Sequence, residues 1–304
     1  MSKEFECEIR AKLPAEELLA TIHEYDGLVV RSASKVTKEV IEAATNLKVI
    51  GRAGVGVDNI DIEAATAKGI IVLNAPEGNT IAATEHTVAM MLSMARNIPQ
   101  AHSSVQNGEW KRNQFVGVEM RGKTLGVIGL GRIGSGVAKR AIAFDMKVIG
   151  YDPYVNEERA KTMGIEVVSL EEIYANADFI SVHMPLTAQT KDLINSETIS
   201  KMKDGVYLVN CASGGIINEA DLAEAVKAGK VAGAAIDVFP KEPIEPNSPL
   251  LGVDKIVLTP HLGASTVEAQ IGVSVDVAYG IVAALKGEPV TTAVNMAPVA
   301  PHVL

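Results

Sequence analysis

The sequence is poor in cysteine, in aromatic residues and in positive charge, and each shortage excludes a class of protein. Its two cysteines, Cys7 and Cys211, cannot form the disulfide framework of a small secreted domain. Aromatic residues make up only 4% of the chain beside 26 glycines, which is typical of an α/β protein rather than an aromatic-rich β-sandwich. With a net charge of −9 we expect no nucleic-acid partner, and an anionic ligand would need a local basic pocket.

The chain also shows no secretion signal and no obvious membrane-spanning run. Its start, MSKEFECEIRAK, is charged and has no apolar stretch. No apolar run approaches the roughly 20 residues that cross a bilayer. We therefore expect a cytoplasmic protein with no membrane partner. A length of 304 residues predicts about two domains.

What the chain does contain is an alternation of short β-branched runs with helical stretches, which is typical of parallel sheets covered by helices. In the first part, FECEIR, GLVVR, LKVIGR and GIIVLN are predicted strands, and 14–23, 37–45 and 61–68 are predicted helices. The second and third of these helices begin after plausible N-caps. The Ala- and Met-rich segment 81–96 is too apolar for a solvent-facing helix, so we expect it between domains or in a symmetric dimer.

A second α/β series predicts seven strands, in the segments LGVI, MKVIGYD, IEVVS, DFISVHM, VYLVNC, GAAIDVF and KIVLTPH. These strands would form a Rossmann-type doubly wound parallel sheet at 77–264. A helix at 265–286 follows. We predict that a smaller, flavodoxin-like α/β domain is assembled from 1–76 and 265–304.

Gly129, Gly131 and Gly134 form a G-x-G-x-x-G pattern directly after an apolar strand and at the start of a helix. Glycine there permits a tight turn, close approach of a pyrophosphate and packing of helix on strand. Asp152 ends the next strand, where a carboxylate accepts ribose hydroxyls and repels a 2′-phosphate. The three glycines and Asp152 together predict that the cofactor is NAD rather than NADP. The alternatives are an ordinary turn for the glycines and a turn-starting Asp-Pro for Asp152.

His261 and Glu242 are the candidates for acid-base chemistry. Hydride transfer to or from a hydroxy acid also moves a proton, which requires a group that titrates near neutral pH. His261 ends a strand at the carboxyl edge of the predicted sheet, where doubly wound folds bind ligands. Glu242, in the loop PKEP, could hydrogen-bond the imidazole and fix its tautomer. Taken alone, the two residues are more simply interpreted as a strand-end histidine and a solvated charge.

Longer motifs resemble a known family along nearly the whole chain. RAGVGVDNID, GKTLGVIGLGRIG, GYDP, NCASGGIINE, GAAIDVFPKEP and TPHLGAST resemble the sequence blocks of the D-isomer-specific 2-hydroxyacid dehydrogenases. The resemblance implies an NAD-dependent enzyme that acts on a small anionic 2-hydroxy or 2-oxo acid, as a homodimer or homotetramer. It favours a phosphorylated acid. Glycerate or glyoxylate is an alternative substrate, and a catalytically silent NAD-binding protein is a further alternative.

The resemblance also implies roles for residues of the larger domain. His261 would be the general acid/base, oriented by Glu242. The cofactor would be bound by Gly129, Gly131, Arg132, Ile133, Gly134, Asp152, Cys211 and Asp237. Of these, Asp237 would lie near the nicotinamide. His86 and His102 are expected to be structural, and no metal site is expected.

For the substrate, the resemblance implies a carboxylate site and a phosphate site. The carboxylate would bind the backbone N–H groups of Gly54, Val55 and Gly56, since glycine leaves such groups unhindered. Arg31 would approach the phosphate, aided by Lys111 or Arg112 from a second subunit. Alternatively, Arg31, Lys111 and Arg112 are ordinary solvated charges on the protein surface.

The chain departs from the family pattern at Ser213, where the family has an arginine that forks onto the substrate carboxylate and carbonyl oxygen. Losing one such donor typically costs about 3 to 4 kcal/mol, or roughly a hundred- to thousandfold in rate. We therefore expect NAD binding to survive with weak turnover. A natural variant with another cation at this place, a crippled enzyme and a deliberate mutant all remain open.

The two ends also depart from the pattern. In the family a strand and a helix precede the piece that corresponds to FECEIR, and that strand lies inside the sheet. Roughly 20 residues, the length of one strand plus one helix, are absent by this comparison. Either FECEIR takes the place of the missing strand in the sheet, or the chain start is not the natural one. The end, AVNMAPVAPHVL, resembles the connector into further regulatory domains.

Overall fold

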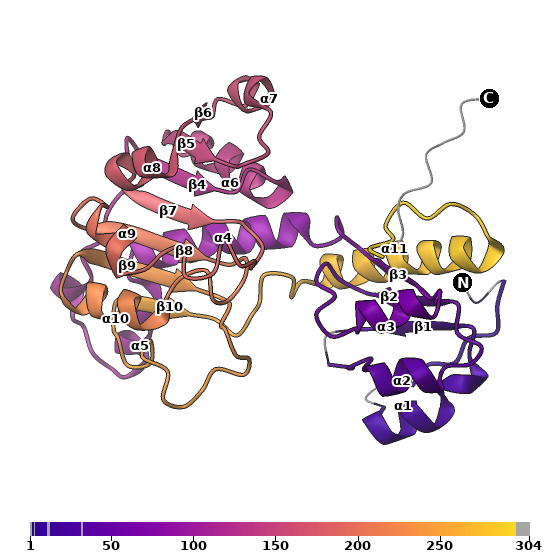
Figure 1. Cartoon of the computed structure of the whole chain (residues 1–304). Helices are drawn as coiled ribbons and strands as arrows, with labels where there is room; N and C mark the ends of the chain where they lie inside the picture. Colours follow the sequence, from indigo (N-terminus) through magenta and orange to yellow (C-terminus); the bar gives the residue numbers. More distant parts are fainter. Residues whose placement is uncertain (1, 3, 11–12, 32, 296–304) are drawn as a thin grey trace. The chain divides into compact units, whose positions relative to one another are not determined.

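The computed structural model describes residues 2, 4–10, 13–31 and 33–295. The chain divides into two compact units (Figure 1). Unit 1 comprises Met1–Thr80 and Ser265–Leu304, and unit 2 comprises Ile81–Ala264. Each unit is a parallel sheet covered by helices.

Unit 2 contains a seven-stranded sheet in the order β10-β9-β8-β7-β4-β5-β6, in which every pair of neighbours is parallel. The strands are β4 (Thr124–Ile128), β5 (Lys147–Tyr151), β6 (Glu166–Val167), β7 (Phe179–Val182), β8 (Val206–Asn210), β9 (Val231–Ile236) and β10 (Ile256–Leu258). All seven predicted strands are present. The strand order reverses between β4 and β7, and doubly wound sheets bind ligands at the carboxyl ends of strands at such a switch point.

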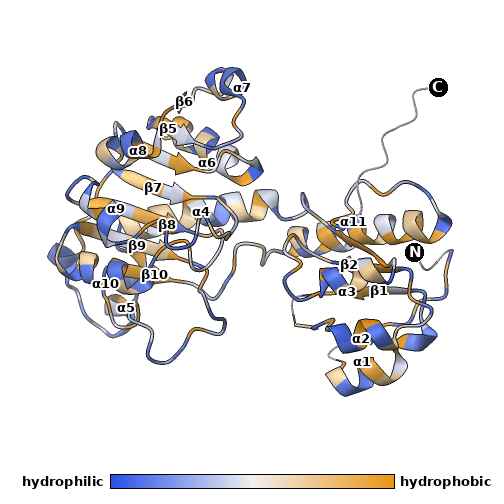
Figure 2. Ribbon diagram, in the orientation of Figure 1, coloured by the Kyte–Doolittle hydropathy of each residue, from blue (hydrophilic) through white to orange (hydrophobic). Residues whose placement is uncertain are grey.

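Helices cover both faces of this sheet. On one face lie α8 (Leu170–Asn176), α9 (Ser196–Ser200) and α10 (Glu219–Lys227), and on the other lie α4 (Thr80–Ala95), α6 (Arg132–Ala143) and α7 (Glu157–Thr162). Two further elements, α5 (Ile98–Gln106) and the 3-10 turn η2 (Arg112–Phe115), follow α4. Figure 2 shows β7 as hydrophobic and α7 as hydrophilic. The apolar runs of the sequence therefore correspond to strands that are buried on both faces.

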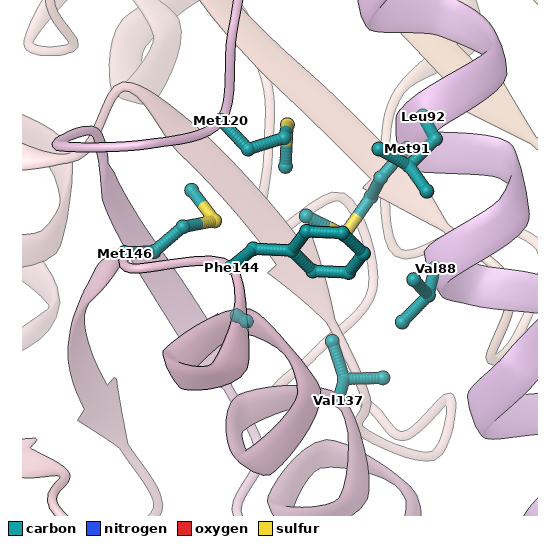
Figure 3. A pocket seen from close by; sticks show the side chains of 8 residues that line it. Val88, Met91, Leu92, Met120, Val137, Phe144 and Met146 are labelled. Carbon is teal, nitrogen blue, oxygen red and sulfur yellow. The ribbon is translucent and has the colours of Figure 1, made fainter.

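The apolar character of α4 is explained largely within unit 2. Met90, Met91 and Met94 are buried in the same core as β4 and α6, so these residues do not need a second subunit to cover them. Our expectation that the segment packs between domains or subunits is wrong for them. A cavity of about 10 Å³ lies beside α4, lined by side chains such as Met91 and Phe144 (Figure 3). It is no larger than a water molecule requires, so it is a packing gap rather than a ligand site.

Unit 1 contains three parallel strands in sequential order, β1 (Gly27–Val30), β2 (Val49–Arg52) and β3 (Ile71–Asn74). One face is covered by α1 (Ala15–Thr21), η1 (Ile22–Glu24), α2 (Lys38–Ala43) and α3 (Ile62–Ala67), and the other by α11 (Val267–Lys286) (Figure 1). Asp61 caps α3, because its side chain accepts the N–H of Ala64 at 2.9 Å. The expected cap Thr37 makes no such bond at the start of α2.

The predicted first strand, FECEIR, is wrong. Residues 6–10 have no strand structure, and Ile9 is 93% exposed. The alternation of Phe5, Cys7 and Ile9 suits a half-buried strand, but a strand also needs a partner. Among the described residues, β1 pairs only with β2, so FECEIR does not move into the sheet. Most of the segment AVNMAPVAPHVL lies outside the described residues.

Our expectation that no apolar run approaches 20 residues is also wrong. Helix α11 is 20 residues long, and its mean hydropathy reaches 1.3 over an 18-residue window. By length and composition alone it could cross a membrane, although the core helices of globular proteins pass the same test. Ala269, Val273, Val277 and Ile281 of α11 are buried, the last three packing with side chains of β2 and β3. The helix therefore serves as a cover for the sheet of unit 1.

Candidate active site

The glycine-rich turn connects β4 to α6, as predicted. Gly129 has a φ of +100°, which favours glycine, and a Cβ there would lie 2.5 Å from the carbonyl oxygen of His183. A Cβ on Gly134 would lie 1.9 Å from the carbonyl oxygen of Gly129, whereas a Cβ on Gly131 would meet nothing within 4 Å. The protein itself fills the space at the outer two glycines and leaves the middle one open. This fits a pyrophosphate that approaches the backbone at the N-terminus of α6.

Asp152 follows β5 and accepts two backbone hydrogen bonds. Its Oδ2 accepts the N–H of Leu130 at 2.8 Å, and its Oδ1 accepts the N–H of Tyr154 at 2.8 Å. The first bond joins Asp152 to the glycine-rich turn, and the second is the local turn expected from Asp-Pro. Each carboxylate oxygen has a further lone pair for a ribose hydroxyl. Both interpretations of Asp152 therefore agree with this geometry. Arg132 and Ile133 form the first turn of α6.

His183 lies under the same turn and was not singled out in the sequence. It follows β7, and its Nε2 is 2.8 Å from the hydroxyl of Ser181. Burial lowers the pKa of His183 to about 4. The imidazole is therefore uncharged at neutral pH and packs against the turn without adding charge.

His261 and Glu242 are in direct contact. The distance from His261 Nδ1 to Glu242 Oε2 is 2.7 Å, and Glu242 Oε1 accepts the N–H of Phe239 at 3.1 Å. An ionised carboxylate can only accept, so Nδ1 is the donor, and in the neutral imidazole Nε2 then has the free lone pair. The side chain of His261 is 56% exposed, which makes Nε2 accessible to a substrate. The pair can therefore act as an oriented general base.

Asp237 holds the turn that carries His261. His261 has a φ of +54°, a conformation that costs a non-glycine residue about 1 to 3 kcal/mol. Asp237 is fully buried; its carboxylate accepts the N–H groups of Leu262 at 2.8 Å and Gly263 at 2.9 Å, and its carbonyl accepts that of His261 at 2.9 Å. Burial is the largest influence on the pKa of Asp237 and raises it, but the hydrogen bonds together keep the pKa below its usual value. Sequence reasoning did not predict this role.

The loop after β8 carries Cys211 and Ser213. The amide of Asn210 shapes it, donating to the carbonyl of Ser213 at 2.9 Å and accepting the N–H of Ala212 at 3.0 Å. A Cβ on Gly214 would lie 2.0 Å from the carbonyl oxygen of Phe239, so the loop touches the segment that carries Glu242. Burial is the main cause that raises the pKa of Cys211 to about 12. The thiol is therefore not a nucleophile at neutral pH.

In unit 1, the predicted carboxylate loop follows β2. The N–H of Gly54 donates to the carbonyl of Arg52 at 2.8 Å, so this group is already used. The N–H groups of Val55 and Gly56 have no acceptor in the part of the chain that the structure describes. Only two of the three predicted amides are therefore open to a ligand.

Arg52, at the end of β2, is a candidate residue that sequence reasoning missed. Its guanidinium is half-buried, its Nη1 donates to the carbonyl of Ala53 at 3.2 Å, and its buried Nε has no partner. Burial lowers the pKa of Arg52, the charge of Arg31 lowers it further, and Asp58 opposes both. An anion bound beside the two arginines would relieve this penalty. The sequence signal that points to Arg52 is the presence of an arginine inside an apolar strand.

The other predicted cations belong to unit 2. Lys111 lies 2.6 Å from Glu109 Oε1, and Arg112 begins η2. Their predicted reach into a second subunit stays a prediction. Among the described residues there is no group of three or more side chains that could hold a metal ion.

Comparisons with known proteins identify the family of this chain. Residues 88–263 match the family "D-isomer specific 2-hydroxyacid dehydrogenase, NAD binding domain". The chain is 54% identical to a D-3-phosphoglycerate dehydrogenase of Archaeoglobus fulgidus over 296 residues, which is 97% of this chain and 56% of that protein. The chain thus spans about half the length of the curated relatives that it matches.

Solved structures give the same result for the fold. A glyoxylate reductase from Paecilomyes thermophila superposes with a TM-score of 0.83 at 32% identity, covering 92% of this chain and 88% of that chain. The apo-structure of D-lactate dehydrogenase from Escherichia coli gives 0.84 at 27% identity, covering 93% and 89%. The family match covers the glycine-rich turn, Asp152 and His261, and the cofactor of such a domain is NAD. This chain therefore belongs to the D-isomer-specific 2-hydroxyacid dehydrogenase family.

Proposed function

We propose that this protein is an NAD-dependent oxidoreductase that interconverts 3-phospho-D-glycerate and 3-phosphohydroxypyruvate, a reaction of serine biosynthesis. The observation that carries the proposal is the 2.7 Å contact between His261 Nδ1 and Glu242 Oε2, at the carboxyl edge of the NAD-binding sheet. The names of relatives at 50% identity or more, such as that of Archaeoglobus fulgidus, support this choice of substrate.

The proton in this reaction is handled by His261. Its Nε2 takes the proton of the substrate C2 hydroxyl during oxidation and returns it during reduction. Glu242, which holds Nδ1–H, fixes the tautomer and stabilises the imidazolium that forms. NAD, when bound by the turn from Gly129 to Gly134 and by Asp152, supplies the hydride acceptor.

Unit 1 contains donors that suit the anionic groups of this substrate. The open N–H groups of Val55 and Gly56 suit a carboxylate, and the half-buried guanidinium of Arg52 with Arg31 beside it suits a phosphate. A substrate with two anionic groups uses both features, whereas glyoxylate uses only one. This favours the phosphorylated acid over the glyoxylate or hydroxypyruvate alternative.

Ser213 favours a second candidate, a catalytically weak NAD-binding protein on the same fold. Its hydroxyl cannot replace the two aligned donors of the family arginine. The contact between His261 and Glu242 argues against this candidate, because a protein without turnover does not need an oriented base.

The test compares NADH consumption with 3-phosphohydroxypyruvate, hydroxypyruvate and glyoxylate under the same conditions. We expect the highest kcat/KM with 3-phosphohydroxypyruvate. A preference for glyoxylate would support the reductase alternative instead. Binding of NADH without consumption in any of the three assays would support the catalytically weak protein.

We also propose a homodimer or homotetramer. Ile98, Val105, Trp110 and Val116 are exposed in the segment that follows α4, and Trp110 is 84% exposed. Exposed apolar groups of this kind mark interaction surfaces. Light scattering should show at least a dimer, and Trp110→Lys should weaken it. A cytoplasmic location without a nucleic-acid or membrane partner stays a prediction.

A further inference from the structure

The side chain of His86, on α4, contacts Asp237 and Thr259, which lie next to the turn that carries His261. Its Nε2 lies 3.1 Å from Asp237 Oδ1 and 3.2 Å from Thr259 Oγ1. The side chain of His86 is 18% exposed, and that of Asp237 is fully buried. The partner of His86 is therefore the same carboxylate that accepts the backbone N–H groups next to His261.

The hydrogen bonds determine where one proton of His86 lies. Thr259 Oγ1 lies 2.5 Å from Asp237 Oδ1 and 3.6 Å from Met90 Sδ, so its single hydroxyl proton is donated to the closer and stronger acceptor, the carboxylate. This leaves Thr259 Oγ1 as an acceptor toward His86. An ionised Asp237 also only accepts, so both atoms that face His86 Nε2 are acceptors. Nε2 must therefore carry a proton. His86 and Thr259 are thus two side-chain donors to one buried carboxylate.

The same carboxylate connects these donors to the backbone beside His261. Asp237 Oδ1 also accepts the N–H of Leu262, and Oδ2 accepts that of Gly263. Both backbone bonds require the carboxylate to keep its orientation. Because His261 itself has a left-handed backbone, its conformation persists only where the surroundings over-determine it.

We propose that His86 is a positioning residue for His261. It orients Asp237, Asp237 orients the N–H groups of Leu262 and Gly263, and the turn then points the His261 imidazole at Glu242. The kinetic part of this inference rests on the function proposed above, whereas the positioning itself can be tested without substrate.

The test uses one disruptive and one conservative variant. His86→Leu removes the donor but keeps an apolar side chain, whereas His86→Gln keeps an N–H near the position of Nε2. His86→Asn retains polarity but is too short to reach Oδ1, so it should behave like the leucine variant and replaces it if that variant does not fold. His23→Leu is the matched control, because His23 is an exposed histidine of unit 1.

The first measurement is made on the protein without substrate. Nitrogen-15 NMR of the six histidine side chains reports their tautomers, and His261→Asn assigns the His261 signals. We expect His86→Leu to shift or broaden the His261 signals, whereas His86→Gln and His23→Leu leave them in place. Unchanged His261 signals in both His86→Leu and His86→Asn would overturn the proposal, whatever the substrate proves to be.

The second measurement separates positioning from a purely structural role. With 3-phosphohydroxypyruvate, His86→Leu should lower kcat about 10- to 100-fold, the usual loss when a supporting partner is removed. The KM should change little, because the proposed carboxylate and phosphate contacts are made by other residues. His86→Gln should restore most of kcat. Equal losses in the two variants, or a loss confined to KM or to thermal stability, would contradict a positioning role.

The NMR and kinetic measurements together also distinguish the failure of this inference from the failure of the proposed function. A wild-type protein that consumes NADH with none of the three acids contradicts the function. The NMR comparison then still decides whether His86 controls the His261 side chain.

Discussion

The turn 259–263 of unit 2 and the loop 52–56 of unit 1 differ in how their polar groups are satisfied. In the turn, the N–H groups of His261, Leu262 and Gly263 all donate to Asp237. In the loop, the N–H groups of Val55 and Gly56 and the buried Nε of Arg52 have no acceptor among the described residues. One region is complete by itself, and the other offers donors that the chain does not use.

This difference follows from what each region is proposed to do. A general base must be oriented before the substrate arrives, because a small misplacement costs much of the rate. Donors that bind an anion must stay available, although each buried unsatisfied group costs about 1 to 3 kcal/mol of stability. Changes in the turn should therefore reduce turnover and stability, whereas changes in the loop should reduce affinity and spare stability.

The largest effect is expected for His261→Asn in the turn. Removing a general acid/base typically lowers kcat about 10²- to 10⁴-fold. The affinity for NADH, measured by fluorescence titration, should stay close to that of the wild type, because the glycine-rich turn and Asp152 are unchanged. A variant that retained a tenth of the wild-type kcat would show that another group moves the proton.

A gain of activity is expected for Ser213→Arg, in the loop that touches the Glu242 segment. One restored charge-assisted donor should raise kcat/KM on 3-phosphohydroxypyruvate by about 10²- to 10³-fold. Ser213→Gln is the control, because it adds length and a neutral donor without the charge. An equal gain in both variants would mean that the low kcat/KM results from the short side chain at position 213 and not from the missing positive charge.

The binding region is tested by Arg52→Met, which keeps the length of the side chain and removes the charge. A hydrogen bond to a charged group contributes about 1.5 to 3 kcal/mol, so the KM for the phosphorylated acid should rise roughly 10- to 100-fold. The KM for hydroxypyruvate should change little, since it has no phosphate. The free energy of unfolding should not fall, because the variant removes a buried cation without a full set of partners. A marked loss of stability would contradict the expectation that changes in the loop 52–56 reduce affinity and spare stability.

The parallel sheet and its carboxyl edge could be predicted because their signals are local. The seven strands of unit 2 are short apolar runs. Gly129 and Asp152 follow such a run directly, and His261 lies three residues after the end of β10. FECEIR failed for a physical reason: alternation shows that a segment could pair, but only the fold shows whether a neighbouring strand exists. Among the described residues β1 pairs only with β2, and this arrangement has no local signature in the sequence.

The environments of Asp237, His86 and Arg52 could not be predicted because they arise only in the folded structure. His86 and Thr259 are 173 residues apart in the sequence and 3.2 Å apart in the structure. Arg52 lies in an apolar strand like many arginines that are simply solvated at their tips. Only the burial of its Nε without a partner distinguishes it.

Asp237→Asn should reduce turnover, like other changes in the turn, and its smaller effect is a loss of stability with a defined pH dependence. The asparagine amide can accept with one atom only, so at least one of the bonds to Leu262, Gly263, Thr259 and His86 is lost, at a cost of about 2 kcal/mol. Because folding lowers the pKa of Asp237, its stabilising contribution is complete above the unfolded value of about 3.9 and is lost as the pH falls through the folded pKa. Urea unfolding at successive pH values should therefore show the largest difference from wild type near neutral pH and a shrinking difference in acid. A difference that stayed constant into acid would mean that the shape of the side chain, not its charge, holds the turn.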